Sequence, residues 1–406
     1  MIGQAYIELY KNGKLYERVE QHNTVTNAIE NRIALDVARG TYGLLYEEDP
    51  KSDESIPLPT RGLGGVWLFD HNLSGGDPIH FPSHEAHMVG YAGQSVNTSD
   101  PFAGSINTLE SGALEEKNGY KNTWDFSTSQ ANGTIASICL THDWAGRSPL
   151  NQATSGWDSM FLHYKYRDLY YDESTGYAYG LRMGDDSDKG LYKYKRPGRY
   201  IKTLSPYFGS GEKVLDLSSA DMRGHIFYDY MGDIIGMRYL SGTSIQLDII
   251  NVSTWTKTTK TITVGVNDTL YAATMCVCRG YIYVCSQSDT TKMYKVDMES
   301  PSLVTTIQMS SGNPSSPYFF PMPMGGVMNS EGRIIYPDGT YQKLTGNSTY
   351  HGVLYGNGYV SDELWCAVDG EPQRALGYIG TVCNLDEPIV KTAATSMKLV
   401  YTLKDA

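Results

Sequence analysis

The chain has 406 residues and a formal net charge of −12, with 19% charged and 40% hydrophobic residues. This length exceeds one ordinary hydrophobic core and predicts two or three domains. The acidic excess would be repelled by phosphate backbones, which argues against nucleic acid as a partner. No apolar run approaches the about 20 residues of a membrane span, so membrane insertion is not expected. The first residues lack the basic and apolar regions of a signal peptide.

The composition predicts an all-β protein. It includes 32 Tyr and 42 Gly. Tyrosine suits the half-buried surface of a strand, and glycine supplies turns between strands. The six cysteines include Cys276 and Cys278 in apolar, strand-like sequence. Their Cys-x-Cys spacing does not match a zinc site, so we expect reduced, buried thiols and no cofactor.

The first 35 residues predict a hairpin followed by one helix. Alternation from Gln4 to Tyr10 leads into the turn signal Asn12-Gly13, and a second extended run reaches Asn23–Asn27. Thr26 or Asn27 can then cap a short helix over residues 28–37.

Residues 41–115 are irregular, and clear strand signals return between 122 and 141. The run Thr123–Ser127 alternates, Asn132-Gly133 turns the chain, and Ile135–Thr141 forms a second apolar run. These two runs are predicted to be a strand pair.

The second half contains a degenerate repeat. Gly176, Gly224, Gly280 and Gly332 each precede an alternating aromatic and β-branched strand. A second strand follows each of them after a polar turn. A unit of roughly 50 residues with several short antiparallel strands has the size of a propeller blade. We therefore expect a β-propeller-like domain of about 4–5 blades over residues 160–375. A string of β-sandwiches with coincidental spacing is the alternative.

Segments near both chain ends resemble tail structural proteins from phages of Gram-positive bacteria. The C-terminal segments Pro388–Thr392 and Met397–Leu403 carry the resemblance, with Trp124–Phe126, Gln130–Ile135 and the opening Leu9–Lys14 followed by Asn23–Asn27. The resemblance implies a tail-tip, baseplate or fibre component, in a virion or an extracellular tail-like particle, made in the bacterial cytoplasm without a signal peptide. Its implied partners are other tail or baseplate proteins, further copies of the chain, and a host-surface glycan or protein.

The last alternating run, Met397–Leu403, ends the chain and needs a partner strand from elsewhere. The runs between 122 and 141 are natural candidates. This predicts a β-sandwich-like attachment domain from residues 1–155, with strands from 376–406 returning to it and the propeller inserted between them. A separate small C-terminal strand unit is the alternative.

Three histidines, His80, His84 and His87, are close enough in sequence to share a metal, with Glu85 or Asp70. Their spacing is not His-Glu-x-x-His, and Pro82 argues against a regular helix. The default interpretation is therefore solvated loop histidines.

Aromatic residues are the better candidates for ligand contacts, because flat rings beside polar groups suit sugars. The candidates are Tyr170, Tyr171, Tyr228, Tyr230, Tyr318 and Trp365. Core packing between strands is the ordinary alternative for each of them.

The sequence thus predicts a non-enzymatic tail protein that presents a propeller for host recognition. One alternative is a carbohydrate-active depolymerase, which needs two carboxylates flanking a sugar, such as Asp229 and Asp233. Another is a purely architectural tail or capsid decoration protein.

Overall fold

The computed structural model describes sixteen stretches of the chain. They are residues 2–25, 63–73, 85–97, 99–141, 166–172, 177–182, 189–195, 211–218, 221–222, 224–310, 319–322, 325–329, 333–343, 366–368, 371–373 and 380–404. Within them every regular element is a β-strand except the 3₁₀ turn η4 (Ala272–Thr274), and none is a helix able to cross a membrane. The protein is therefore all-β, as its composition predicts. The helix predicted over residues 28–37 lies outside the described residues.

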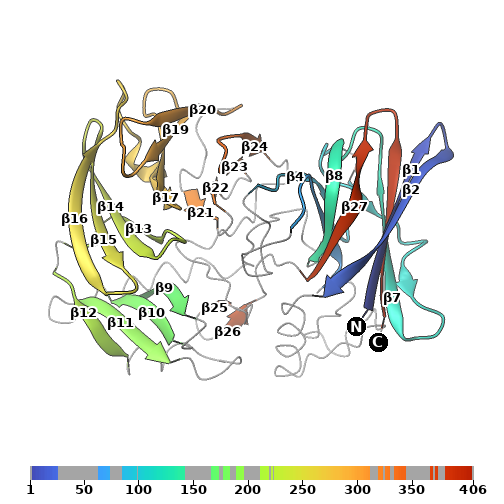
Figure 1. Ribbon diagram of the computed structural model, residues 1–406, viewed down its shortest axis with the longest axis horizontal. Coiled ribbons are helices and arrows are strands. Elements are labelled where there is room, and N and C mark those ends of the chain that lie inside the picture. The colour runs from blue at the N-terminus through green and yellow to red at the C-terminus, as the bar shows by residue number, and fades with distance from the viewer. Residues whose placement is uncertain are drawn as a thin grey trace.

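Ten strands form one nearly closed, barrel-like sheet (right side of Figure 1). They are β1 (Ile2–Lys11), β2 (Lys14–Val25), β3 (Gly65–Phe69), β4 (Met88–Ala92), β5 (Ser105–Ile106), β6 (Gly112–Ala113), β7 (Gly119–Phe126), β8 (Gly133–Thr141), β27 (Thr381–Lys391) and β28 (Ser396–Lys404). Their order is β4-β3-β8-β27-β2-β1-β28-β7-β5, with β6 also paired to β7. Strands from both chain ends thus lie at the centre of one sheet.

Contacts between the two edges bring the sheet close to closure. Tyr91 of β4 forms an isolated parallel bridge with Ala103, and the Gly104 N–H donates to the Tyr91 carbonyl at 2.8 Å. The indole N–H of Trp124 in β7 donates to the Gly93 carbonyl, just after β4, at 3.2 Å. One core fills the interior, where Trp124 packs with the inward side chains of β1, β3, β8, β27 and β28.

The N-terminal hairpin is confirmed. β1 and β2 pair antiparallel around Asn12 and Gly13, whose φ angles of 52° and 74° form the left-handed turn that Asn-Gly favours.

The predicted pairing of the two runs between 122 and 141 is wrong, although both are strands. β7 pairs with β28 and β8 with β27, so the chain crosses the barrel between them. β27 and β28 are likewise consecutive but separated in the sheet by the β1–β2 hairpin. The two strands of each of these pairs, β7 with β8 and β27 with β28, therefore lie on different parts of one curved sheet. Their hydrogen-bond partners include strands from the other end of the chain.

Four further sheets follow β8 along the chain, each of four antiparallel strands (left side of Figure 1). The first contains β9 (Tyr166–Asp172), β10 (Tyr177–Arg182), β11 (Gly190–Lys195) and β12 (Glu212–Asp216). The second contains β13 (His225–Tyr228), β14 (Asp233–Ser241), β15 (Ser244–Asn251) and β16 (Thr256–Thr263). The third contains β17 (Cys276–Cys278), β18 (Tyr281–Cys285), β19 (Lys292–Asp297) and β20 (Val304–Gln308). The fourth contains β21 (Phe319–Pro321), β22 (Val327–Asn329), β23 (Arg333–Ile335) and β24 (Tyr341–Lys343). A pair, β25 (Cys366–Val368) and β26 (Glu371–Gln373), precedes β27.

The first strands of the four sheets meet one another. β13 contacts β9 and β17, and β17 contacts β21. Apolar side chains from neighbouring sheets share cores, such as the cluster that joins Phe227 of the second sheet, Val284 of the third and Val327 of the fourth. Neighbouring sheets are therefore packed against each other, and their first strands are in contact.

The strands that follow the repeat glycines occupy different places in their sheets. β10 and β18 are second strands, β13 is a first strand, and β23 is a third strand. The glycine spacing therefore does not mark equivalent positions in the four sheets.

The barrel-like sheet and the fourth small sheet pack directly on each other. Trp67, Met88 and Cys139 on the barrel side share an apolar cluster with Met328 and Tyr336. This junction makes the two parts of the chain neighbours in space.

Candidate functional site

The structure brings Tyr228 and Tyr230 together at the end of β13. Tyr228 ends β13, and Tyr230 lies in the following turn with a φ of 60°. Their ring centroids are 5.4 Å apart in an edge-to-face arrangement. Tyr228 packs against the core of the first two sheets, and Tyr230 packs against the core shared by the second, third and fourth sheets. Both half-buried rings therefore fill space between sheets, and burial raises the pKa of Tyr230.

Asp229 holds this turn in place. One of its carboxylate oxygens accepts the N–H groups of Met231 at 2.8 Å and Asp233 at 3.0 Å. Burial raises the pKa of Asp229, and these backbone N–H groups oppose the rise. The Asp229 carbonyl also accepts the Arg279 N–H at 2.7 Å, which ties the turn to the third sheet. The Asp229 carboxylate therefore stabilises the turn through these hydrogen bonds.

Within the described residues, the structure does not bring the remaining aromatic candidates together. Tyr170 and Tyr171 lie in β9, where only the backbone is described, and Tyr318 and Trp365 lie outside the described residues.

Of the three candidate metal-binding histidines, only His87 falls within the described residues. His80 and His84 lie outside them. The His87 ring nitrogens face two carboxylates, with Nδ1 3.2 Å from Asp70 Oδ2 and Nε2 3.2 Å from Asp338 Oδ2. Within the described stretches no three His, Cys, Asp or Glu side chains could hold a metal ion. Through its contacts with Asp70 and Asp338, His87 links the barrel to the turn between β23 and β24.

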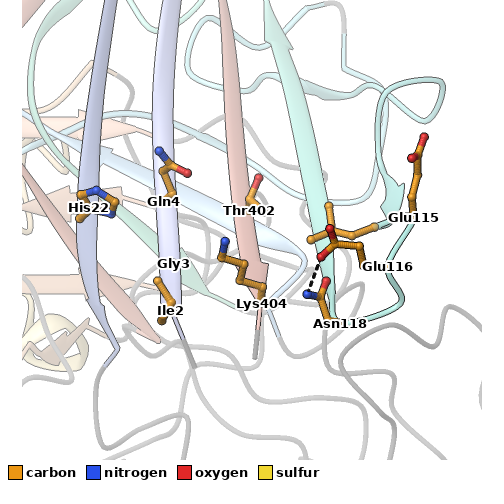
Figure 2. A pocket seen from close by; sticks show the side chains of 10 residues that line it. Ile2, Gly3, Gln4, His22, Glu115, Glu116, Asn118, Thr402 and Lys404 are labelled. Carbon is orange, nitrogen blue, oxygen red and sulfur yellow. Dashed lines mark hydrogen bonds between the residues drawn. The ribbon is translucent and has the colours of Figure 1, made fainter. Parts of the chain in front are cut away.

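A hollow of about 420 Å³ lies at the end of the barrel where the chain begins and ends. Figure 2 shows His22, Gln4, Thr402 and Lys404 on adjacent strands, with Glu115, Glu116 and Asn118 on the turn after β6. Ile2, Gly3 and Leu114 complete the lining.

The strand register builds the floor of this hollow. Gln4 is paired with His22 on β2 and with Thr402 on β28, so the three side chains form one row across adjacent strands. Lys404 pairs with Gly119 on β7. A Cβ at Gly119 would lie 2.2 Å from the Leu403 carbonyl oxygen, so the close approach requires glycine here.

A fixed turn builds the wall. The Leu114 N–H donates to the Gly119 carbonyl at 2.9 Å, and the Lys117 N–H donates to the Leu114 carbonyl at 2.8 Å. The Asn118 amide then donates to the Glu116 carboxylate at 3.0 Å. These bonds hold the turn beside β28 without any ligand, so the hollow is preformed.

Sequence reasoning missed this site. Its residues come from both chain ends and from 114–118, and no motif joins them. The Asn118-Gly119 dipeptide could have indicated a turn, but only the pairing of β28 with β1 and β7 places Lys404 and that turn in one hollow.

No protein-family model matches the chain, and no curated protein sequence matches it. Two solved structures are similar over 70% of the chain. One is Hsv2 from Kluyveromyces lactis, 10% identical, covering 74% of that chain with a TM-score of 0.23. The other is apo AztD from Citrobacter koseri, 12% identical, covering 83% of that chain with a TM-score of 0.25. At these TM-scores neither likeness informs the fold or the function.

Proposed function

We propose that the protein is a structural component of the tail tip or baseplate of a phage or a phage-tail-like bacteriocin. Its barrel-like sheet, from residues 1–155 and 376–406, attaches it to the particle. Its small sheets, within residues 160–375, form a propeller that contacts a host-surface glycan or protein.

The observation that carries the proposal is the position of the segments that resemble tail proteins. Leu9–Lys14 forms the tip of the β1–β2 hairpin, Trp124–Phe126 lies in β7, and Met397–Leu403 lies in β28. In the sheet, β28 lies between β1 and β7, and β27 lies beside β8. Segments from opposite ends of the chain thus become hydrogen-bonded neighbours, which supports one shared attachment unit.

The propeller part of the proposal is supported by the four small sheets. Each follows the chain as a simple antiparallel meander, and their first strands contact one another in sequence. Meanders whose first strands meet in this way support blades placed around a common axis. The β25–β26 pair follows the fourth sheet in the chain and is where a closing blade would come.

The insertion itself fits a display role. The chain leaves the barrel after β8 and returns at β27. Attachment through one unit leaves the other free to meet a surface, and many copies in a particle convert weak contacts into firm attachment.

The proposed attachment of the protein to a tail particle is tested on purified particles. Antibodies against the full chain are applied to tails purified from a lysate of the producing strain, and electron microscopy locates the label. We expect label at one end of the tail. Particles that carry no label would contradict the assignment.

The proposed contact with a host surface is tested with purified full-length protein and cell walls from a panel of Gram-positive bacteria. We expect the protein to co-sediment with the walls of some strains and to release no soluble sugar. Release of reducing ends would favour the depolymerase. Labelled tails without binding to any wall would favour a purely architectural protein.

A further inference from the structure

The hollow at the end of the barrel is lined by side chains of opposite charge. Lys404 lies on β28, and Glu115 and Glu116 lie on the turn after β6, beyond β7, as Figure 2 shows. Among the described residues no ion pair joins either side to the other, whereas Lys398, near the start of β28, does pair, with Glu110 at 2.6 Å.

The separation of these charges is built into the fold. Lys404 is fixed on β28 by its pairing with Ile2 and Gly119. The turn is held by its own hydrogen bonds, including the one from Asn118 to Glu116. Neither side needs the other to keep its position, so the space between them can admit a solute.

The size and shape suit a small polar group. A volume of about 420 Å³ falls within the range of roughly 300–1,000 Å³ typical of small-molecule sites. The strands offer the Lys404 ammonium, the Thr402 hydroxyl and the Gln4 amide, and the turn offers carboxylates. The Gln4 amide already donates to Glu20, which leaves its orientation fixed.

We propose that this hollow binds a zwitterionic group, with its amine toward Glu115 and its anion toward Lys404. A ligand that carries both charges meets both sides at once, whereas a simple anion or cation meets one partner and one like charge. Because strand pairing and the hydrogen bonds of the turn fix the backbone on both sides, electrostatic complementarity favours such a ligand. The site is separate from the proposed host contact of the small sheets and does not depend on it.

The test is a titration of full-length protein followed by ligand-observed NMR. Phosphoethanolamine is the phosphate-bearing probe and β-alanine the carboxylate-bearing probe. Ethanolamine and inorganic phosphate supply each half alone. We expect at least one zwitterion to bind about fivefold more tightly than either half. The preferred zwitterion then shows whether the anion is a phosphate or a carboxylate.

Two variants locate the binding. Lys404→Gln and Glu115→Gln change exposed side chains that make no hydrogen bond within the described part of the chain, so the fold is expected to remain intact. Each is expected to weaken zwitterion binding about fivefold. Lys14→Gln and Glu17→Gln are charge-matched controls on exposed positions near the other end of β2 and are expected to leave binding unchanged.

The proposal is overturned if neither zwitterion binds, or if phosphate alone binds as tightly as phosphoethanolamine. Equal binding by the hollow variants and the controls would also overturn it, because the ligand would then sit elsewhere. None of these measurements uses cell walls or particles, so the proposal of zwitterion binding and the proposal of a host contact can fail independently.

Discussion

The hydroxyl group of Tyr336, in the fourth small sheet, accepts the N–H of Met88, in the barrel, at 3.2 Å. The same hydroxyl donates to the Gln342 side-chain amide, whose own N–H₂ donates back to the Met88 carbonyl at 3.1 Å. One tyrosine thus closes a hydrogen-bonded loop between the two parts of the molecule. Its ring lies edge-on to His87 with centroids 4.4 Å apart, so polar and aromatic contacts meet at the junction.

Replacing Tyr336 by phenylalanine is expected to destabilise the protein. Tyr336 is 2% exposed and Met88 is 3% exposed, so the variant leaves a buried N–H without its acceptor. The expected loss in the free energy of unfolding is about 1–3 kcal/mol. Urea denaturation of the variant measures it. Tyr16→Phe, at a tyrosine that is 62% exposed, is the matched control. Similar stability of the two variants would argue against the junction.

Two of the repeat glycines are expected to respond differently to alanine. Gly224 has a φ of 84°, and a Cβ there would lie 2.1 Å from the Met237 carbonyl oxygen. Gly280 has a φ of 77°, but its nearest neighbour would be the Met231 sulfur at 3.8 Å. Gly280→Ala should cost about 1 kcal/mol for the left-handed backbone, and Gly224→Ala should cost about 3 kcal/mol or more. Thermal unfolding compares them, and equal losses would contradict the close approach at Gly224.

The strands were predictable because alternation is a local property. The patterns at 191–194, 245–250, 281–284 and 293–297 fall within strands β11, β15, β18 and β19, respectively. The neighbouring strand of each strand was harder to predict, because alternation determines which face of the sheet a side chain lies on but not which strand pairs beside it. β7 and β8 follow each other in sequence, yet each is bonded to a strand from the C-terminal end.

The glycine period failed as a guide to sheet boundaries for a related reason. Gly224 and Gly280 both supply a left-handed backbone, but they do so before a first strand and before a second strand. A turn glycine marks a reversal of the chain, and every four-stranded meander has several reversals. The candidate binding residues depend even more on tertiary structure, since Lys404 and Glu115 become neighbours only through strand pairing.

The described thiols are expected to be unreactive in the folded protein. Cys139, Cys276, Cys278, Cys285 and Cys383 are free and buried. Burial raises the pKa of Cys285 to about 11 and that of Cys278 to about 12. Since the thiolate is the nucleophile, labelling by a disulfide reagent should be slow until denaturant is added. Mass spectrometry of a Cys366→Ser variant checks this, and rapid labelling of any of the five in native protein would contradict it.

Lys391 is expected to make stability rise with pH in the mildly alkaline range. It is 1% exposed, and its ammonium donates to the Ser127 carbonyl at 2.8 Å and the Asn132 side chain at 3.0 Å. No described carboxylate pairs with it, and burial lowers its pKa to about 8.

The sign follows from proton binding in the two states. The unfolded chain holds this proton up to a pKa of about 10.4, whereas the folded chain releases it near pH 8. Between these values the unfolded state binds more protons, so the free energy of unfolding increases with pH, by about 2–3 kcal/mol in total. Below pH 8 the full cost of burying the charge opposes folding.

The measurement is the difference in unfolding free energy between the unmodified protein and Lys391→Met, followed from pH 7 to 10.5. The difference cancels the titration of other groups and should rise in favour of the unmodified protein. Lys398→Met is the control, with a difference expected to stay flat over this range, because the hydrogen bond to Glu110 raises the pKa of Lys398. Stabilisation by Lys398 is present below its unfolded pKa and is lost as the pH rises through its folded pKa. Parallel pH profiles for the two variants would show that Lys391 is solvated, and the β7–β8 turn would then not be closed over it.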